Sequence, residues 1–137
     1  MDIANAYNSW SAQYDTNDNK TRDLEALSLQ KIVQGKNFKH CLEVGCGTGK
    51  NTAWLLTICY QITAIDLSNG MLEIAKNKIQ SERVNFIEAD ITKDWTFAKN
   101  TYDLVTFSLM LEHIEDLHAV FQKLSIVTAT GSHVYIG

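Results

Sequence analysis

After residue 40, short apolar runs alternate with segments whose apolar residues recur at helical spacing. Alternation of strand and helix in this way is typical of βαβ units, which build a parallel sheet. The right-handed crossovers of such units place helices on both faces of the sheet. We therefore predict an α/β fold around a parallel sheet of about five strands. The predicted strands are residues 40–44, 61–65 (ending on Asp66), 84–88, 102–107 and 133–136.

Helices are predicted between these strands. The first runs through residues 51–57, the second has Ser68 as its N-cap, and Gly131 ends the last one. We also expect Trp54 and Phe121 to be core residues. The apolar faces of the second and last helices are formed by Met71, Leu72, Ala75 and Ile79 and by Leu117, Val120, Phe121, Leu124 and Val127.

The chain before residue 37 has a different pattern. A short helix is expected around residues 3–10 and an amphipathic one around 21–33, with a polar loop at 15–19 between them. We expect one domain over 1–137, in which 1–36 form a helical lid and 37–137 the α/β core. The last predicted strand lies at a sheet edge without a partner, an edge that proteins usually cover. A second copy or another protein is therefore expected there, or the chain is a C-terminally truncated piece of a longer enzyme.

Composition narrows the class of protein. The chain has 137 residues, of which 45% are hydrophobic and 20% charged, and a formal net charge of −4. This acidic balance argues against a nucleic-acid partner, and no apolar run reaches the roughly 18 residues of a membrane span. The three cysteines, Cys41, Cys46 and Cys59, form no C-x-x-C pair, which argues against a metal site and suits a reducing compartment. We expect a soluble, cytoplasmic protein.

A glycine-rich loop at 45–49 follows the first predicted strand and precedes a helix. In that context glycines permit a tight turn and a close approach of a ligand to the backbone. Dinucleotide-binding loops have the pattern G-x-G-x-x-G, but here the third glycine is Gly49 and Lys50 follows it, so a dehydrogenase is disfavoured. Asp66 and Asp90 end the second and third predicted strands. A carboxylate at the end of the second strand can accept both hydroxyls of a ribose.

This series of motifs resembles the class I S-adenosylmethionine-dependent methyltransferases. The matching segments are residues 43–49, 64–68 followed by 71–72, 89–91, 102–105 and 111–116, so the resemblance covers roughly residues 40–137. It implies a Rossmann-like sheet with the strand order 3-2-1-4-5 and a ligand site at the carboxyl ends of the strands. Two features depart from the family. Thr130-Gly131-Ser132 replaces its common Pro-Gly-Gly turn, and its C-terminal helix and antiparallel strand pair do not follow.

The resemblance also implies a binding site for S-adenosyl-L-methionine. The glycine loop would hold the methionine part, Glu43 would orient its amino group, and Asp66 would hold the ribose hydroxyls. Other residues would line the adenine, and Phe107 would lie near the methionine part. The implied cofactor-binding residues are Glu43, Gly45, Cys46, Gly47, Gly49, Asp66, Leu67, Met71, Asp90, Ile91 and Phe107.

The sequence assigns no catalytic residue. Methyl transfer from a sulfonium depends mostly on positioning, and a base is needed only when the acceptor is protonated. His113 follows the fourth strand as a weak candidate for that base, although a capping or surface histidine fits better. Tyr7, Trp10 and Tyr14 either form an aromatic lid or pack a helix on the sheet. Arg22 either meets the cofactor carboxylate or is a solvated charge.

We therefore expect a methyltransferase that moves a methyl group from S-adenosylmethionine to a small-molecule acceptor. The tyrosine-bearing N-terminal segment loosely resembles those of small-molecule methyltransferases, and the acidic charge disfavours nucleic-acid substrates. A second hypothesis is a non-catalytic subunit or regulator that binds the same cofactor and needs a partner to complete the fold.

Overall fold

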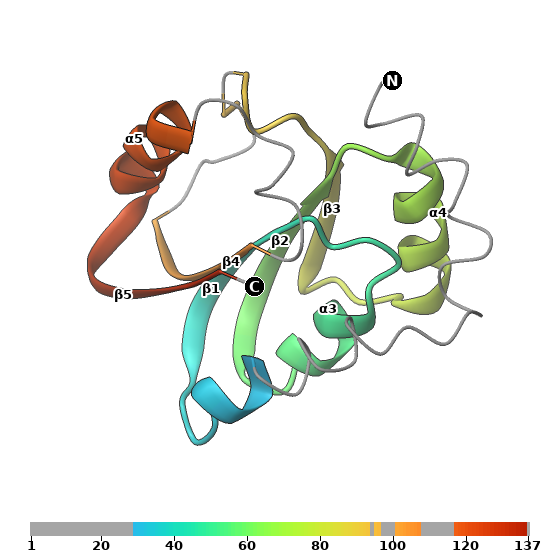
Figure 1. Ribbon diagram of the computed structural model, residues 1–137. Helices are drawn as coiled ribbons and strands as arrows, with labels where there is room; N and C mark the ends of the chain where they lie inside the picture. The colour runs from blue at the N-terminus through green and yellow to red at the C-terminus, as the bar shows by residue number, and fades with distance from the viewer. Residues whose placement is uncertain (1–28, 94, 97–100, 108–116, 137) are drawn as a thin grey trace.

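A computed structural model describes residues 29–93, 95–96, 101–107 and 117–136 of the chain. These residues form a parallel sheet with the strand order β3-β2-β1-β4-β5 (Figure 1). The predicted α/β class and strand order are therefore confirmed. The strands are β1 (Phe38–Val44), β2 (Cys59–Asp66), β3 (Val84–Glu88), β4 (Tyr102–Phe107) and β5 (Thr128–Ile136).

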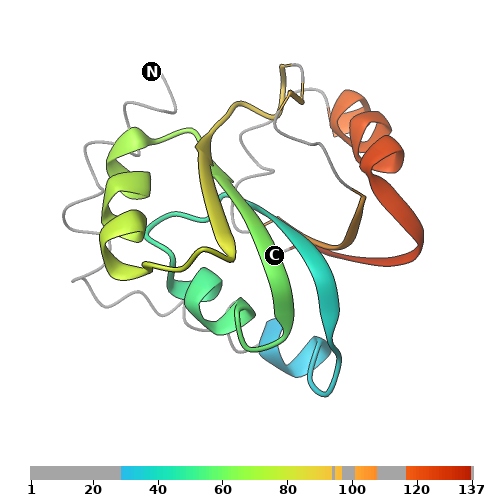
Figure 2. The same ribbon diagram turned by 180° about the vertical axis from the view of Figure 1, so that it is seen from behind.

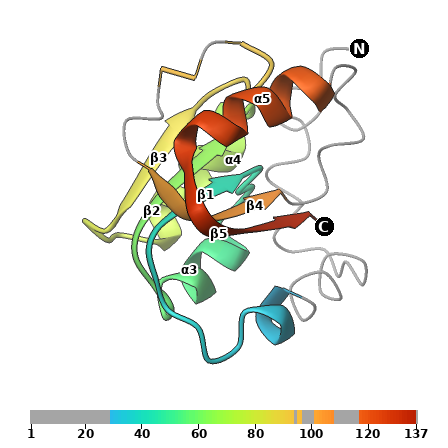
Figure 3. The ribbon, with the colours of Figure 1, turned by 90° about the vertical axis from the view of Figure 1, so that its left-hand side faces the viewer.

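Helices cover both faces of this sheet. The helices α3 (Lys50–Leu55) and α4 (Asn69–Lys78) lie side by side on one face (Figures 1 and 2). The helix α5 (Leu117–Val127) lies on the opposite face, as the view along the sheet in Figure 3 shows. Residues 29–32 are also helical and lie on the α3 side. This arrangement is the one that right-handed crossovers between parallel strands produce.

Two apolar clusters fill the spaces between the sheet and its helices. On the α3 side, Leu55 and Leu72 pack with Leu29 against the sheet, and on the α5 side Val120 and Leu124 do so. The central strand β1 contributes to both clusters, because successive side chains of a strand point to opposite faces. Its residues 41–44 are all buried, as expected for a central strand of a parallel sheet covered on both faces.

The helix α4 agrees closely with its prediction. The Ser68 hydroxyl accepts a hydrogen bond from the Met71 amide at 3.1 Å and so caps the first turn. Met71, Leu72 and Ala75 are buried, with Leu72 in the α3-side cluster, and Ile79 is the half-buried C-cap. Lys76 and Lys78 lie in the last turn, where a positive charge is favoured by the helix dipole.

The junction between α5 and β5 differs from its prediction. The helix ends at Val127 rather than at Gly131, and β5 begins at once with Thr128. Tyr102 is paired with Thr128 and Leu104 with His133, so β5 carries extra residues at its start. Gly131 lies in this irregular stretch with φ of 82°, a conformation that glycine adopts at little cost. Only from His133 does the pairing become regular, which is the stretch that the sequence predicted.

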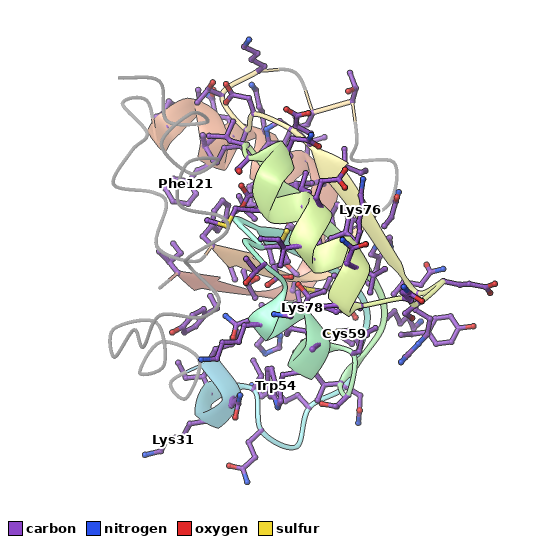
Figure 4. The ribbon with its side chains drawn as sticks, turned by 90° about the vertical axis from the view of Figure 1, so that its right-hand side faces the viewer. Lys31, Trp54, Cys59, Lys76, Lys78 and Phe121 are labelled. Carbon is purple, nitrogen blue, oxygen red and sulfur yellow. The ribbon has the colours of Figure 1, made fainter. Side chains whose placement is uncertain are left out.

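Three other boundaries and one core residue also differ from their predictions. The helix α3 ends at Leu55, not at residue 57, while β1 begins at Phe38 and β2 at Cys59, each two residues earlier than predicted. Phe121 was expected in the core but is 37% exposed. Trp54 is half-buried against the α3-side cluster. Figure 4 shows these two side chains on α5 and α3, well apart from each other.

Some predictions concern residues outside the described part of the chain. These are the helix at 3–10, most of the helix at 21–33, the aromatic residues Tyr7, Trp10 and Tyr14, and the candidates Arg22 and His113. Within the described ranges, no helix has both the length and the apolar character needed to cross a membrane.

Candidate functional site

The glycine loop leads from the carboxyl end of β1 to α3 (Figure 1). Its three glycines all have positive φ, namely 79° at Gly45, 56° at Gly47 and 89° at Gly49. The amides of Gly45 and Cys46 donate to the Ile65 carbonyl at 2.9 and 3.1 Å, which anchors the loop on β2. Because L-residues with a side chain disfavour this backbone region, the loop depends on glycine for its shape.

Gly47 and Gly49 serve different purposes within the loop. A Cβ atom on Gly49 would lie 2.8 Å from Ile79 Cδ1 and 3.3 Å from Ala75 Cβ, so this glycine lets α3 pack closely on α4. A Cβ atom on Gly47 would meet no atom of the described residues within 4 Å. Among these residues, the backbone at Gly47 is therefore left uncovered, which permits the close approach of a ligand.

Asp66 ties the glycine loop to the start of α4. Its Oδ2 accepts a hydrogen bond from the Gly47 amide at 2.9 Å, and its Oδ1 accepts one from the Ser68 amide at 2.8 Å. The side chain is only 7% exposed. Burial raises the pKa of this carboxyl, while the amides of Ser68, Gly47 and Leu67 oppose the rise. Each carboxylate oxygen can accept a further hydrogen bond, so a role in the turn leaves room for ribose hydroxyls.

Asp90 also forms a turn, beside Asp66. Its Oδ1 accepts hydrogen bonds from the Thr92 amide at 2.9 Å and from the Thr92 hydroxyl at 2.6 Å. The Ala89 amide donates to the Asp66 carbonyl at 3.0 Å, which brings the two strand ends together. Ile91 is 1% exposed and packs in the α5-side cluster. Asp66 and Asp90, predicted to end the second and third strands, therefore both lie at the carboxyl ends of the strands.

Glu43 is a buried carboxylate near the end of β1. It is 1% exposed, and its Oε1 accepts a hydrogen bond from the hydroxyl of Thr52 on α3. Thr52 was not among the site residues predicted from the sequence. A signal was available, because a threonine in the first turns of a helix after a glycine loop can turn back toward the preceding strand. Thr52 thus holds Glu43 in place at the beginning of the loop.

The remaining predicted residues are mostly apolar and buried. Cys46 is 6% exposed, and burial together with the negative charges of Glu43 and Asp66 raises the pKa of its thiol well above the ordinary value. It is therefore a thiol rather than a reactive thiolate. Met71 and Phe107 are nearly fully buried, and Leu67 packs partly buried against the α5-side cluster. The Phe107 ring makes an edge contact with Phe121 at 6.5 Å.

The site presents groups that suit a polar organic ligand. Within the described residues there is no group of three or more His, Cys, Asp or Glu side chains that could hold a metal. The loop supplies backbone amides and open space, and the strand ends supply carboxylates. Ligands of parallel α/β sheets bind at this position, outside the carboxyl ends of the strands.

Comparisons with known proteins agree with this geometry. A family model described as a methyltransferase domain matches residues 42–136. The malonyl-[acyl-carrier protein] O-methyltransferase of Priestia megaterium is 39% identical over 85 residues, which are 61% of this chain and 30% of that enzyme. The ubiquinone biosynthesis O-methyltransferase of Vibrio cholerae is 29% identical over 117 residues, which are 82% of this chain and 48% of that enzyme. The chain thus spans less than half the length of these relatives.

A solved structure agrees as well. The DhpI–SAH complex has a TM-score of 0.82 and 26% sequence identity, and the match covers 96% of this chain and 65% of DhpI. The family model begins just before the glycine loop and ends within β5, so it includes every part of the site described above. Because this family model matches residues 42–136, which contain the glycine loop and most of the sheet, the chain belongs to the methyltransferase domain family.

Proposed function

We propose that this chain binds S-adenosylmethionine and transfers its methyl group to a small-molecule acceptor. The observation that carries the proposal is the buried Asp66 carboxylate, which is bonded to the glycine loop and still has acceptor capacity. Two of the relatives named above are O-methyltransferases, and the solved neighbour is a complex with SAH, the demethylated cofactor. These similarities support the same activity here.

We assign parts of the cofactor to residues of the chain as follows. Asp66 accepts hydrogen bonds from the ribose hydroxyls. Gly47 has no side chain, so the ligand can come close to the backbone there. Glu43, held by Thr52, accepts the ammonium group of the methionine part. The hydrogen bond from the Ala89 amide to the Asp66 carbonyl brings the end of β3, and with it Asp90, close to Asp66. We assign the edge of the adenine to Asp90. The apolar residues of the predicted set line the adenine and the methionine part.

The chain contributes mainly by positioning. When bound, the cofactor supplies a methyl group that is already activated on a sulfonium. The glycine loop and its carboxylates fix the direction of that methyl, and an acceptor held in line behind it gains the rate advantage of two oriented reactants. Nearly complete burial of Glu43, Met71 and Phe107 excludes water from this part of the site. No described residue is assigned as a base, and His113 stays a prediction.

The architecture beyond the described residues is part of the proposal. Residues 1–36 form a helical lid over the site, in one domain with the core at 37–137. Within the described part, Leu29 and Val33 are buried against the α3-side cluster, which supports a docked N-terminal segment. We place the protein in the cytoplasm, with no nucleic-acid or membrane partner.

We also propose a protein partner for the edge strand β5. Val134 and Ile136 are 43% and 50% exposed there, and apolar side chains on an edge strand favour pairing with another chain. We propose a second copy at this edge. Light scattering over a range of concentrations tests it, with Val134→Lys as the variant expected to shift the mass toward the monomer. A wild-type mass that stays monomeric at high concentration contradicts it.

A calorimetric titration tests the proposed function. S-adenosylmethionine and SAH are each titrated into the folded protein, with NAD as a control that shares the adenosine but needs a different phosphate-binding loop. We expect both sulfur-containing ligands to bind and NAD to give no heat. A folded sample that binds neither ligand, or that binds NAD equally well, contradicts the proposal.

A further inference from the structure

A row of aligned residues crosses the α3 face of the sheet close to the carboxyl ends of the strands. The positions in this row, from β2 to β5, are Ala64, Glu43, Thr106 and Tyr135. Two residues earlier on the same face, Cys41 and Leu104 belong to the α3-side apolar cluster. Because side chains two residues apart on a strand share a face, Thr106 points to the same side as Glu43 and α3.

Thr106 has no apparent structural reason for its hydroxyl. The residue is 0% exposed, and its Oγ1 has no hydrogen-bond partner among the described residues. Other buried hydroxyls on this side are bonded, such as that of Thr52, which donates to Glu43. Buried polar groups in native proteins are nearly always hydrogen-bonded, and those that are not call for an explanation. Valine has the same shape and would fill the same space without an unpaired oxygen.

The neighbour of Thr106 on the adjacent strand is the Glu43 carboxylate. Neighbouring strands lie about 4.8 Å apart, so at these aligned positions the Thr106 and Glu43 side chains are neighbours on one face of the sheet. Thr52 already donates to Oε1 of Glu43. A carboxylate has about four acceptor positions on its two oxygens and can therefore take a donor from the β4 side as well.

We propose that Thr106 is a positioning residue for Glu43, and that its hydroxyl donates to the Glu43 carboxylate when that carboxylate receives the ammonium group of the cofactor. This inference rests on the proposed function. Donors from α3 and from β4 then hold the carboxylate on two sides and fix its plane toward the ligand. The Thr106 hydroxyl, which has no partner among the described residues, is the donor that β4 supplies to this arrangement.

The test uses the full chain with Thr106→Val, which keeps the shape, and Thr106→Ser, which keeps the hydroxyl. Each protein is titrated by calorimetry with SAH and with 5′-methylthioadenosine, which has the nucleoside and the thioether but no amino-acid end. We expect Thr106→Val to weaken SAH binding about five- to tenfold, as for the net loss of one hydrogen bond of ordinary strength. Methylthioadenosine binding is unchanged, and Thr106→Ser binds both ligands like the wild type.

A second readout separates this role from a structural one. Without ligand, Thr106→Val is expected to melt at the same temperature as the wild type or higher, because it removes an unpaired buried hydroxyl. In a double-mutant cycle with Glu43→Gln, the losses of SAH affinity are expected to be less than multiplicative. A melting temperature several degrees lower for Thr106→Val assigns the hydroxyl to the fold and overturns the inference.

Two binding results also overturn it. One is a wild type and a Thr106→Val variant with equal affinity for SAH, and the other is an equal loss for SAH and methylthioadenosine. In both cases the wild type binds the cofactor, so the proposed function survives. A folded wild type that binds neither ligand removes the proposed function together with the inference.

Discussion

Each end of the sheet contains an aspartate that accepts hydrogen bonds from two backbone amides. At the carboxyl end, Asp66 receives the amides of Gly47 and Ser68. At the amino end, Asp103 receives the amides of Lys39 and His40 at 2.8 and 2.9 Å. Asp66 is 7% exposed and its pKa is raised by burial, whereas Asp103 remains partly exposed to water. The same hydrogen-bonding pattern therefore occurs in two different environments.

The difference in burial separates the structural role expected of Asp103 from the ligand-binding role expected of Asp66. A partly exposed carboxylate that joins two strands adds stability at little desolvation cost. A buried carboxylate loses more hydration, and a ligand that donates further hydrogen bonds to its charged form offsets that loss. We therefore expect Asp103 to act on stability alone and Asp66 to act on ligand binding as well.

The largest expected effect comes from Gly49, the N-cap of α3, which packs against α4. Gly49→Ala is expected to lower the free energy of unfolding by about 2–4 kcal/mol, the sum of a left-handed backbone and an overpacked contact. Its φ is 89°, and a Cβ atom would lie 3.3 Å from Ala75 Cβ and 2.8 Å from the Cδ1 atom of Ile79, the end of a side chain that can rotate away. Urea denaturation measures this, with Gly35→Ala as the matched control, because Gly35 has φ of 78° and nothing within 4 Å of its Cβ position. Equal losses in both variants contradict the packing contribution.

Asp66→Ala tests whether Asp66, unlike Asp103, contributes to ligand binding. We expect SAH affinity to fall by about 1.5–3 kcal/mol, as for a lost pair of charge-assisted hydrogen bonds. Calorimetry measures the affinity, and circular dichroism checks that the variant is folded. Asp103→Ala is the matched control and is expected to bind SAH like the wild type. Unchanged affinity in folded Asp66→Ala removes this residue from the site.

Asp103→Ala tests the contribution of Asp103 to the stability of the fold. The amides of Lys39 and His40 lose their acceptor, so the free energy of unfolding is expected to fall by about 1–2 kcal/mol. The loss is modest because water can reach these partly exposed groups. Thermal unfolding measures it. A stability equal to that of the wild type would mean that the bonds between β1 and β4 do not depend on this carboxylate.

The smallest expected effect is a pH dependence at the amino end. His40 is partly buried, its Nε2 lies 2.9 Å from Thr63 Oγ1, and its ring contacts Tyr102 edge-on at 4.7 Å. Burial lowers its pKa below 6.5, and the nearby Asp103 carboxylate opposes this shift. The unfolded chain therefore binds the proton first on acidification, and the stability that neutral His40 contributes above pH 6.5 is lost as the pH falls below that value.

His40→Gln checks this dependence. The variant has no titrating group at this position, so its melting temperature is expected to fall less steeply between pH 7 and pH 5 than that of the wild type. Parallel curves for the two proteins would show that His40 does not contribute to the acid sensitivity.

Much of the fold was predictable because it depends on local pattern. The bounds of β3 and β4 and the Ser68 cap agree with the structure, since apolar runs and a capping hydroxyl act within a few residues. The junction between α5 and β5 was not predictable from local pattern, because the end of α5 and the irregular start of β5 depend on pairing with β4. Phe121 has the spacing of a core residue, yet 37% of it is exposed on α5.

The sequence alone was enough to predict the α/β class and the place of the glycine loop between a strand and a helix, whereas the strand order was implied by the resemblance of its motifs to a known family. Periodicity, glycine content and the handedness of βαβ crossovers are properties of short segments. The partners of the buried polar groups came only from the folded chain. Thr52 reaches Glu43, Asp66 reaches the Gly47 amide, and the Thr106 hydroxyl stays unpaired beside Glu43. These contacts join residues from different elements, and their distances exist only once helices and strands have packed.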